Sequence, residues 1–164
     1  MVRDVRTSRR AGSLALALAL LAGCGREPAA APSTPAYVPG LGEIMTLQQM
    51  RHAKLWLAGS AGNWPLASYE TDELEEGFAD VVAYHPTHKE SPVPIAQVVP
   101  EIMDGRVRAL RAAVDAKDPK KFEAAFDALT EGCNACHRAT NFGFNVVVRP
   151  AASTFANQDF RPPN

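Results

Sequence analysis

The sequence predicts an all-α protein, a four-helix bundle in up-down-up-down order followed by an irregular C-terminal tail. Four stretches between residues 43 and 138 repeat their apolar residues at steps of three and four, the spacing of one face of an α-helix. No stretch ahead of residue 133 alternates apolar and polar residues over a sustained length, as a half-buried strand would. The connections between the stretches are short to moderate, which favours antiparallel neighbours.

The first three helices are predicted from apolar spacing and from prolines. The first covers residues 43–59. The second begins at Trp64 and is stopped by Pro86, because proline cannot continue a helix. The third runs to about Ala116, and Pro100 either starts it or kinks it.

The fourth helix carries the clearest pattern. Asp118 and Pro119 open it, since aspartate is a good N-cap and proline suits the first helical position. Large apolar or thiol side chains then recur at steps of 4, 3, 4 and 3, namely at Phe122, Phe126, Leu129, Cys133 and Cys136. This spacing is typical of a bundle seam, so both cysteines are predicted on the same buried face as the phenylalanines.

Length and charge limit the classes of function. With 164 residues, the chain has room for one globular domain and a tail. Residues 1–23 hold four arginines and one aspartate; without them the 17 basic and 18 acidic residues fall to 13 and 17, a net charge of −4. Nucleic-acid binding needs clustered lysine and arginine, so we expect no nucleic-acid partner.

The N-terminus has the features of a secretory signal peptide. Residues 1–10 are polar and basic, and residues 11–22 form an apolar run that is too short to span a bilayer stably. The run ends in Leu-Ala-Gly-Cys, which resembles the bacterial lipobox. The resemblance implies that residues 1–23 are removed and that Cys24 carries lipid on the periplasmic side of a membrane, with Gly25 slightly favouring the outer membrane. A plain signal peptide with an incidental cysteine is the alternative.

The rest of the chain divides into three predicted parts. Residues 24–40 are rich in proline and alanine and hold almost no large apolar side chains, so they are predicted to be a flexible tether. Residues 41–138 form the helical domain. Residues 139–164 form a C-terminal extension.

Cys133-Asn134-Ala135-Cys136-His137 has the C-x-x-C-H spacing at which haem c is attached. On a helix, two thiols three positions apart are neighbours that can form thioethers to two vinyl groups, and the next histidine becomes the proximal iron ligand. A thioredoxin-like redox pair would need a preceding strand, and a zinc site would need a second pair of ligands. The sequence therefore predicts one covalent haem c, held by Cys133 and Cys136 and ligated by His137.

The position of this motif, at the end of the last predicted helix, resembles class II c-type cytochromes, the cytochrome c′ group. The resemblance covers residues 42–138 and rests on the motif and on the order of the helices. It implies a four-helix bundle with haem on the final helix and a distal residue from the first helix. The apolar residues of the extension depart from this pattern, and are predicted to cover the haem edge as a lid or to cross the bundle as a strap.

The distal residue stays open at this point. Helical phase favours Met50, which shares a stripe with other apolar residues. Met45 lies in the first turn, where low-spin members of the group tend to carry the ligand, and His52 is a third candidate. Residues 51–55, Arg-His-Ala-Lys-Leu, are similar to the Arg-Gln-x-x-Leu stretch of some cytochromes c′. That likeness would put Leu55 against the iron and leave it five-coordinate.

Together these features predict a membrane-tethered periplasmic monohaem cytochrome that carries single electrons and is not an enzyme. Its redox partner is a protein that the sequence does not identify. A five-coordinate protein that binds or senses NO or CO is one alternative, and a haem-bearing accessory subunit of a respiratory complex is another. The resemblance also leaves room for a homodimer, since dimers are common among cytochromes c′.

Overall fold

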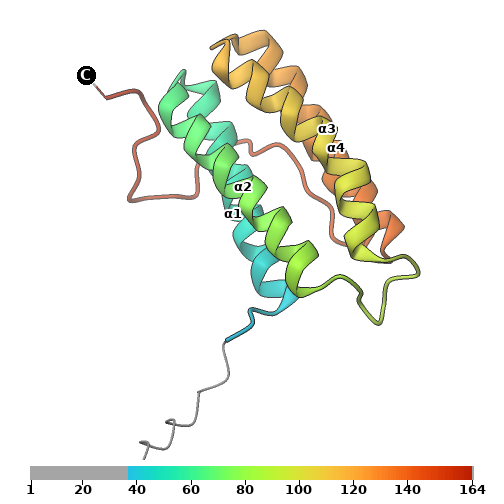
Figure 1. The fold of residues 1–164 in the computed structure, drawn as a ribbon. Coiled ribbons are helices and arrows are strands. Elements are labelled where there is room, and N and C mark those ends of the chain that lie inside the picture. The colour runs from blue at the N-terminus through green and yellow to red at the C-terminus, as the bar shows by residue number, and fades with distance from the viewer. Residues whose placement is uncertain (1–36, 164) are drawn as a thin grey trace, which may run out of the picture. The chain divides into compact units, whose positions relative to one another are not determined.

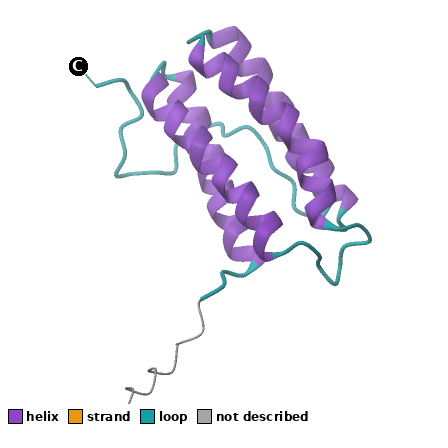
Figure 2. Cartoon of the chain, in the orientation of Figure 1, coloured by secondary structure: helices purple, strands orange, loops and turns teal. Residues whose placement is uncertain are grey.

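The computed structural model describes residues 37–163, and in this range the chain consists of four α helices and no strand (Figure 1 and Figure 2). The helices are α1 (Leu41–Ser60), α2 (Trp64–Tyr84), α3 (Ile95–Asp115) and α4 (Pro119–Ala139). The all-α prediction is therefore confirmed. Residues 1–36, with the predicted signal peptide, Cys24 and most of the tether, lie outside the described residues.

The predicted cap of the last helix is present. Asp118 is the N-cap of α4, and its carboxylate accepts hydrogen bonds from the backbone N–H groups of Lys120 and Lys121, both at 3.1 Å. Pro119 fills the first helical position, where a missing N–H leaves no bond unmade. The start of α4 is thus fixed by local chemistry that is visible in the sequence.

The structure decides between the two alternatives for Pro100. Pro100 does not begin the third helix: α3 starts at Ile95, and Pro100 lies inside it. Pro94 is the N-cap, and its carbonyl accepts the N–H groups of Gln97 and Val98. Because proline has no N–H, the helix gives up one internal hydrogen bond at position 100.

Each helix runs antiparallel to the next one in sequence, as the up-down-up-down prediction requires (Figure 1). α1 packs along α2, α3 packs along α4, and α2 joins the two pairs through α3. α1 and α4 touch only over a short stretch. α2 ends at Tyr84, ahead of Pro86, as predicted.

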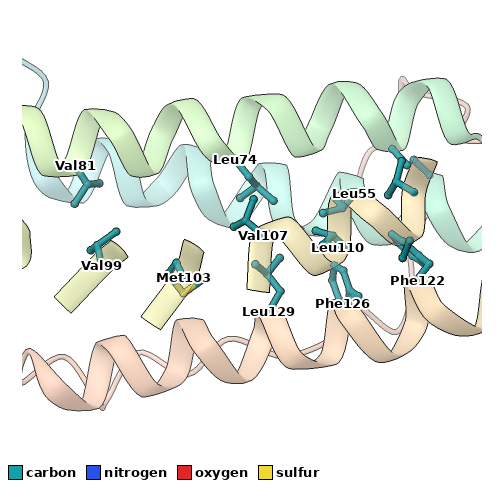
Figure 3. Close-up of a cluster of buried hydrophobic side chains, with 14 of the residues drawn as sticks. Leu55, Leu74, Val81, Val99, Met103, Val107, Leu110, Phe122, Phe126 and Leu129 are labelled. Atoms are coloured by element: carbon teal, nitrogen blue, oxygen red, sulfur yellow. The ribbon is translucent and has the colours of Figure 1, made fainter. Parts of the chain in front are cut away.

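The core is built from apolar side chains of all four helices (Figure 3). Phe122, Phe126 and Leu129 of α4 are almost fully buried, which confirms the predicted seam up to that point. Cys133 and Cys136 continue the same stripe, but they are only partly buried and pack at the edge of the core.

The extension after α4 runs back along the bundle as a strap (Figure 1). Arg149 forms ion pairs with Asp127 and Glu123 of α4, and its guanidinium lies 4.4 Å from the ring centre of Trp56 on α1. Farther on, the side chain of Asn63 donates a hydrogen bond to a backbone carbonyl of the strap, at residue 161. The strap thus bridges α1 and α4, the two helices that share the fewest backbone contacts of the neighbouring pairs.

Candidate functional site

Two contacts fix the register between α1 and α4. Nε2 of His52 lies 2.8 Å from Oγ1 of Thr130. Farther along, a Cβ built on Gly59 would lie 2.1 Å from Cζ of Phe122, so these two positions also face each other. Because the helices are antiparallel, stepping seven residues from the His52–Thr130 pair leads to Met45 on α1 and His137 on α4.

An open cavity lies between the helices at this level. Its volume is about 180 Å³, and α4 contributes Cys133, Cys136 and His137 to its wall. Met45 and His52 line it from α1. The opposite wall is mostly apolar and comes from α2 and α3, namely from Leu74, Phe78, Val99 and Met103.

A second cavity of about 270 Å³ adjoins the first. The two share Met45, Cys136 and His137 in their walls, and the second extends to Phe142 and Phe144 in the C-terminal extension. Sites for small molecules and cofactors are clefts with mainly apolar walls and a few polar groups. The lining of this space therefore suits a mostly apolar group.

The two thiols are free and protonated at neutral pH. Burial raises the pKa of Cys133 to about 12 and also raises the pKa of Cys136. Redox-active cysteine pairs have the opposite property, a lowered thiol pKa that yields thiolate. The cysteines of this site therefore line a cavity as protonated thiols rather than as reactive thiolates.

His137 has one nitrogen occupied and one free. Its Nδ1 lies 2.6 Å from the backbone carbonyl oxygen of Asn145 in the extension. A carbonyl oxygen can only accept a hydrogen bond, so Nδ1 carries the proton and Nε2 keeps its lone pair. His137 also lines both cavities, which makes Nε2 the available metal-binding atom of the site.

The prediction that Met50 faces inward is wrong. Its side chain is 36% exposed, and it lines neither of the two cavities. The buried stripe of α1 passes instead through Gln48 and His52, two polar residues. Gln48 is satisfied there by a 2.9 Å hydrogen bond to the carbonyl of Leu74, and His52 by its contact with Thr130. Gln48 and His52 thus occupy the inner face of α1, and Met50 lies on its exposed face.

His52 stands on the inner wall of the first cavity and is buried. Thr130 donates its hydroxyl proton to the carbonyl of Phe126 at 2.9 Å, so it accepts a hydrogen bond from Nε2 of His52. Burial lowers the pKa of His52 to about 4, which keeps the ring neutral at physiological pH. Leu55 is fully buried in the core and lines neither cavity, so nothing in the structure places it against a bound group.

Of the four candidates for the distal position, Met45 therefore has the best place. It lines both cavities and lies at the level of His137 on the opposite helix. Sequence reasoning missed Asn134 and Asn145, the asparagines that connect α4 to the extension. The only signal for them was that one falls inside the C-x-x-C-H motif.

Comparison with protein-family models, curated proteins and solved structures gives no match to this chain. Among the helices of residues 37–163, none has both the length and the apolar character needed to span a bilayer.

Proposed function

We propose that this chain is a membrane-tethered periplasmic monohaem c-type cytochrome that carries single electrons. One observation carries the proposal: the C-x-x-C-H residues line the cavity between the helices, and the hydrogen bond on Nδ1 of its histidine leaves Nε2 free to bind a metal. Haem c would supply reversible one-electron exchange at its iron. Cys133 and Cys136 would hold it covalently against α4.

The chain's own side chains favour electron transfer over exchange of small ligands. Met45 comes from the helix opposite His137 and lines the same space, so we propose its thioether as the distal ligand. The apolar side chains of α2 and α3 that line that space would lie against the haem and limit its contact with water. Thioether ligation and low solvent exposure both raise a reduction potential.

The proposed anchor fits the place where the chain enters the bundle. The carbonyl of Pro39, just ahead of α1, lies 2.8 Å from Nε2 of His85 at the end of α2. The start of α1 lies at the same end of the bundle as His137 and the cavity. Lipid on Cys24 would thus tether the haem end of the domain, within reach of a redox partner protein at the periplasmic membrane surface.

An absorption spectrum with and without CO tests the function. The protein is expressed with the haem c maturation machinery, reduced, and exposed to CO. We expect a low-spin spectrum that CO does not change, and we expect no covalent haem in a Cys133→Ala/Cys136→Ala control. A spectrum that shifts with CO would support the five-coordinate NO or CO binding alternative instead, and would contradict electron transfer through a six-coordinate iron.

A further inference from the structure

The chain that follows α4 folds back over His137. The N–H of Phe142 donates to the carbonyl of His137 at 2.7 Å, and the N–H of Asn145 donates to the carbonyl of Phe142 at 2.8 Å. This turn carries the carbonyl of Asn145 to Nδ1 of His137. The position of that carbonyl depends on how the next residues of the chain are held.

Asn134 holds them. Its side-chain Nδ2 donates to the carbonyl of Val147, and its Oδ1 accepts the N–H of Val147, both at 2.8 Å. A side-chain amide that makes both hydrogen bonds to one residue fixes the position and direction of that peptide. Val147 is two residues beyond Asn145, so the carbonyl on His137 lies between the turn and this clamp.

The clamp has a chemical consequence for the imidazole. A second hydrogen bond on a metal-binding histidine fixes its tautomer and ring orientation and makes the ligating nitrogen more basic. A more basic ligand favours the oxidised metal. Asn134 lies three positions before His137 on the same helix, so the clamp and the imidazole are close along α4.

We propose that Asn134 is a positioning residue for His137: by fastening the strap, it holds the carbonyl that fixes the imidazole tautomer and ring orientation. The inference rests on the proposed function, because it takes Nε2 of His137 as the iron ligand. It gives the C-terminal extension a role in setting the reduction potential as well as in packing.

The test compares Asn134→Ala with the wild-type holoprotein. Two properties are measured on protein whose covalent haem has been verified by mass: hydrogen exchange of the His137 Nδ1 proton by NMR, and the midpoint potential. We expect faster exchange and a more positive potential, with the reduction equilibrium constant changed about tenfold, or about 59 mV for one electron. The sign is informative, because mere entry of water would lower the potential.

Asn141→Gly is the matched control. Asn141 makes another bond between the extension and the bundle, from its Nδ2 to the carbonyl of Glu90 at 3.0 Å, and its φ of 66° is one that glycine adopts freely. We expect this variant to leave exchange and potential unchanged. Wild-type values in Asn134→Ala, a negative shift in it, or an equal positive shift in Asn141→Gly would overturn the inference. A chain without covalent haem would instead contradict the proposed function.

Discussion

At the scale of single residues, the bond that one imidazole nitrogen makes decides what the other can do. His52 uses Nε2 to bind Thr130 and is buried, whereas His137 uses Nδ1 to bind a backbone carbonyl at a cavity wall. Nε2 lies at the far end of the ring from the backbone, so His137 is the better placed of the two to reach a metal. His52 is a neutral structural residue of the inner face.

Stability should depend on pH through His52. Its pKa is about 4 in the folded chain and about 6.5 when unfolded, so between these values only the unfolded state binds the proton. The free energy of unfolding should therefore fall as pH is lowered from 6.5 toward 4, by about 1.4 kcal/mol per pH unit from this group. Urea unfolding of the holoprotein at several pH values measures it. A His52→Gln variant should lose this part of the slope, and an identical slope in both proteins would contradict the assignment.

Met45 and Met50 can be separated by a matched pair of substitutions. Met45→Ala should open the distal position, so that the reduced protein binds CO, and should lower the potential because a thioether raises it. Met50→Ala removes the same side chain from the exposed face of α1 and should change neither property. CO titration and potentiometry of the two variants measure both effects. CO binding by Met50→Ala and not by Met45→Ala would reverse the assignment.

At the scale of elements, α4 could be predicted from sequence and the inner face of α1 could not. Asp118, Pro119 and the spacing of the phenylalanines are local signals, and they all act within α4. On α1 the buried positions include Gln48 and His52, whose partners lie on other helices. Apolar periodicity cannot show which polar residues will find such partners, so it selected the wrong stripe.

Close packing between α1 and α4 makes a prediction about Gly59. Alanine there would place Cβ 2.1 Å from the buried ring of Phe122, so the substitution should destabilise the protein by about 1–3 kcal/mol. Gly105→Ala in α3 is the control, since its Cβ would meet nothing closer than 4.0 Å. That change should stabilise the protein by about 0.5–1 kcal/mol, because alanine has a higher helix propensity than glycine. Chemical denaturation of both variants measures the change in the free energy of unfolding. Equal changes in the two variants would contradict the close contact.

The path of the C-terminal strap was also beyond prediction, because side-chain bonds to distant partners determine it. Arg149 makes such interactions, namely its ion pairs to α4 and its contact with Trp56. Arg149→Ala should loosen the strap, so that a protease specific for phenylalanine cuts faster after Phe155. Arg161→Ala should not, because that side chain pairs with Asp159 inside the strap itself. Equal cleavage rates in the two variants would contradict this role of Arg149.

At the scale of the whole molecule, the cavity exists because two helical hairpins join mainly through α2 and α3. The cavity separates α1 from α4 at the level of Met45 and His137, and Asn145 and Val147 of the strap line part of its wall. The position of the C-x-x-C-H motif predicted a cofactor at this end of the bundle, where the structure has a cavity. The size of the space and the strap that covers it depend on packing between distant segments, which the sequence pattern does not encode.

The proposed function requires that the mature protein carries one haem on the last helix and lipid at its N-terminus. The most direct measurement is the intact mass of the protein extracted from membranes of cells that express the full chain with the haem c maturation machinery. We expect a chain that lacks residues 1–23 and is heavier by one covalent haem and by lipid on Cys24. A mass without haem would contradict the proposed function.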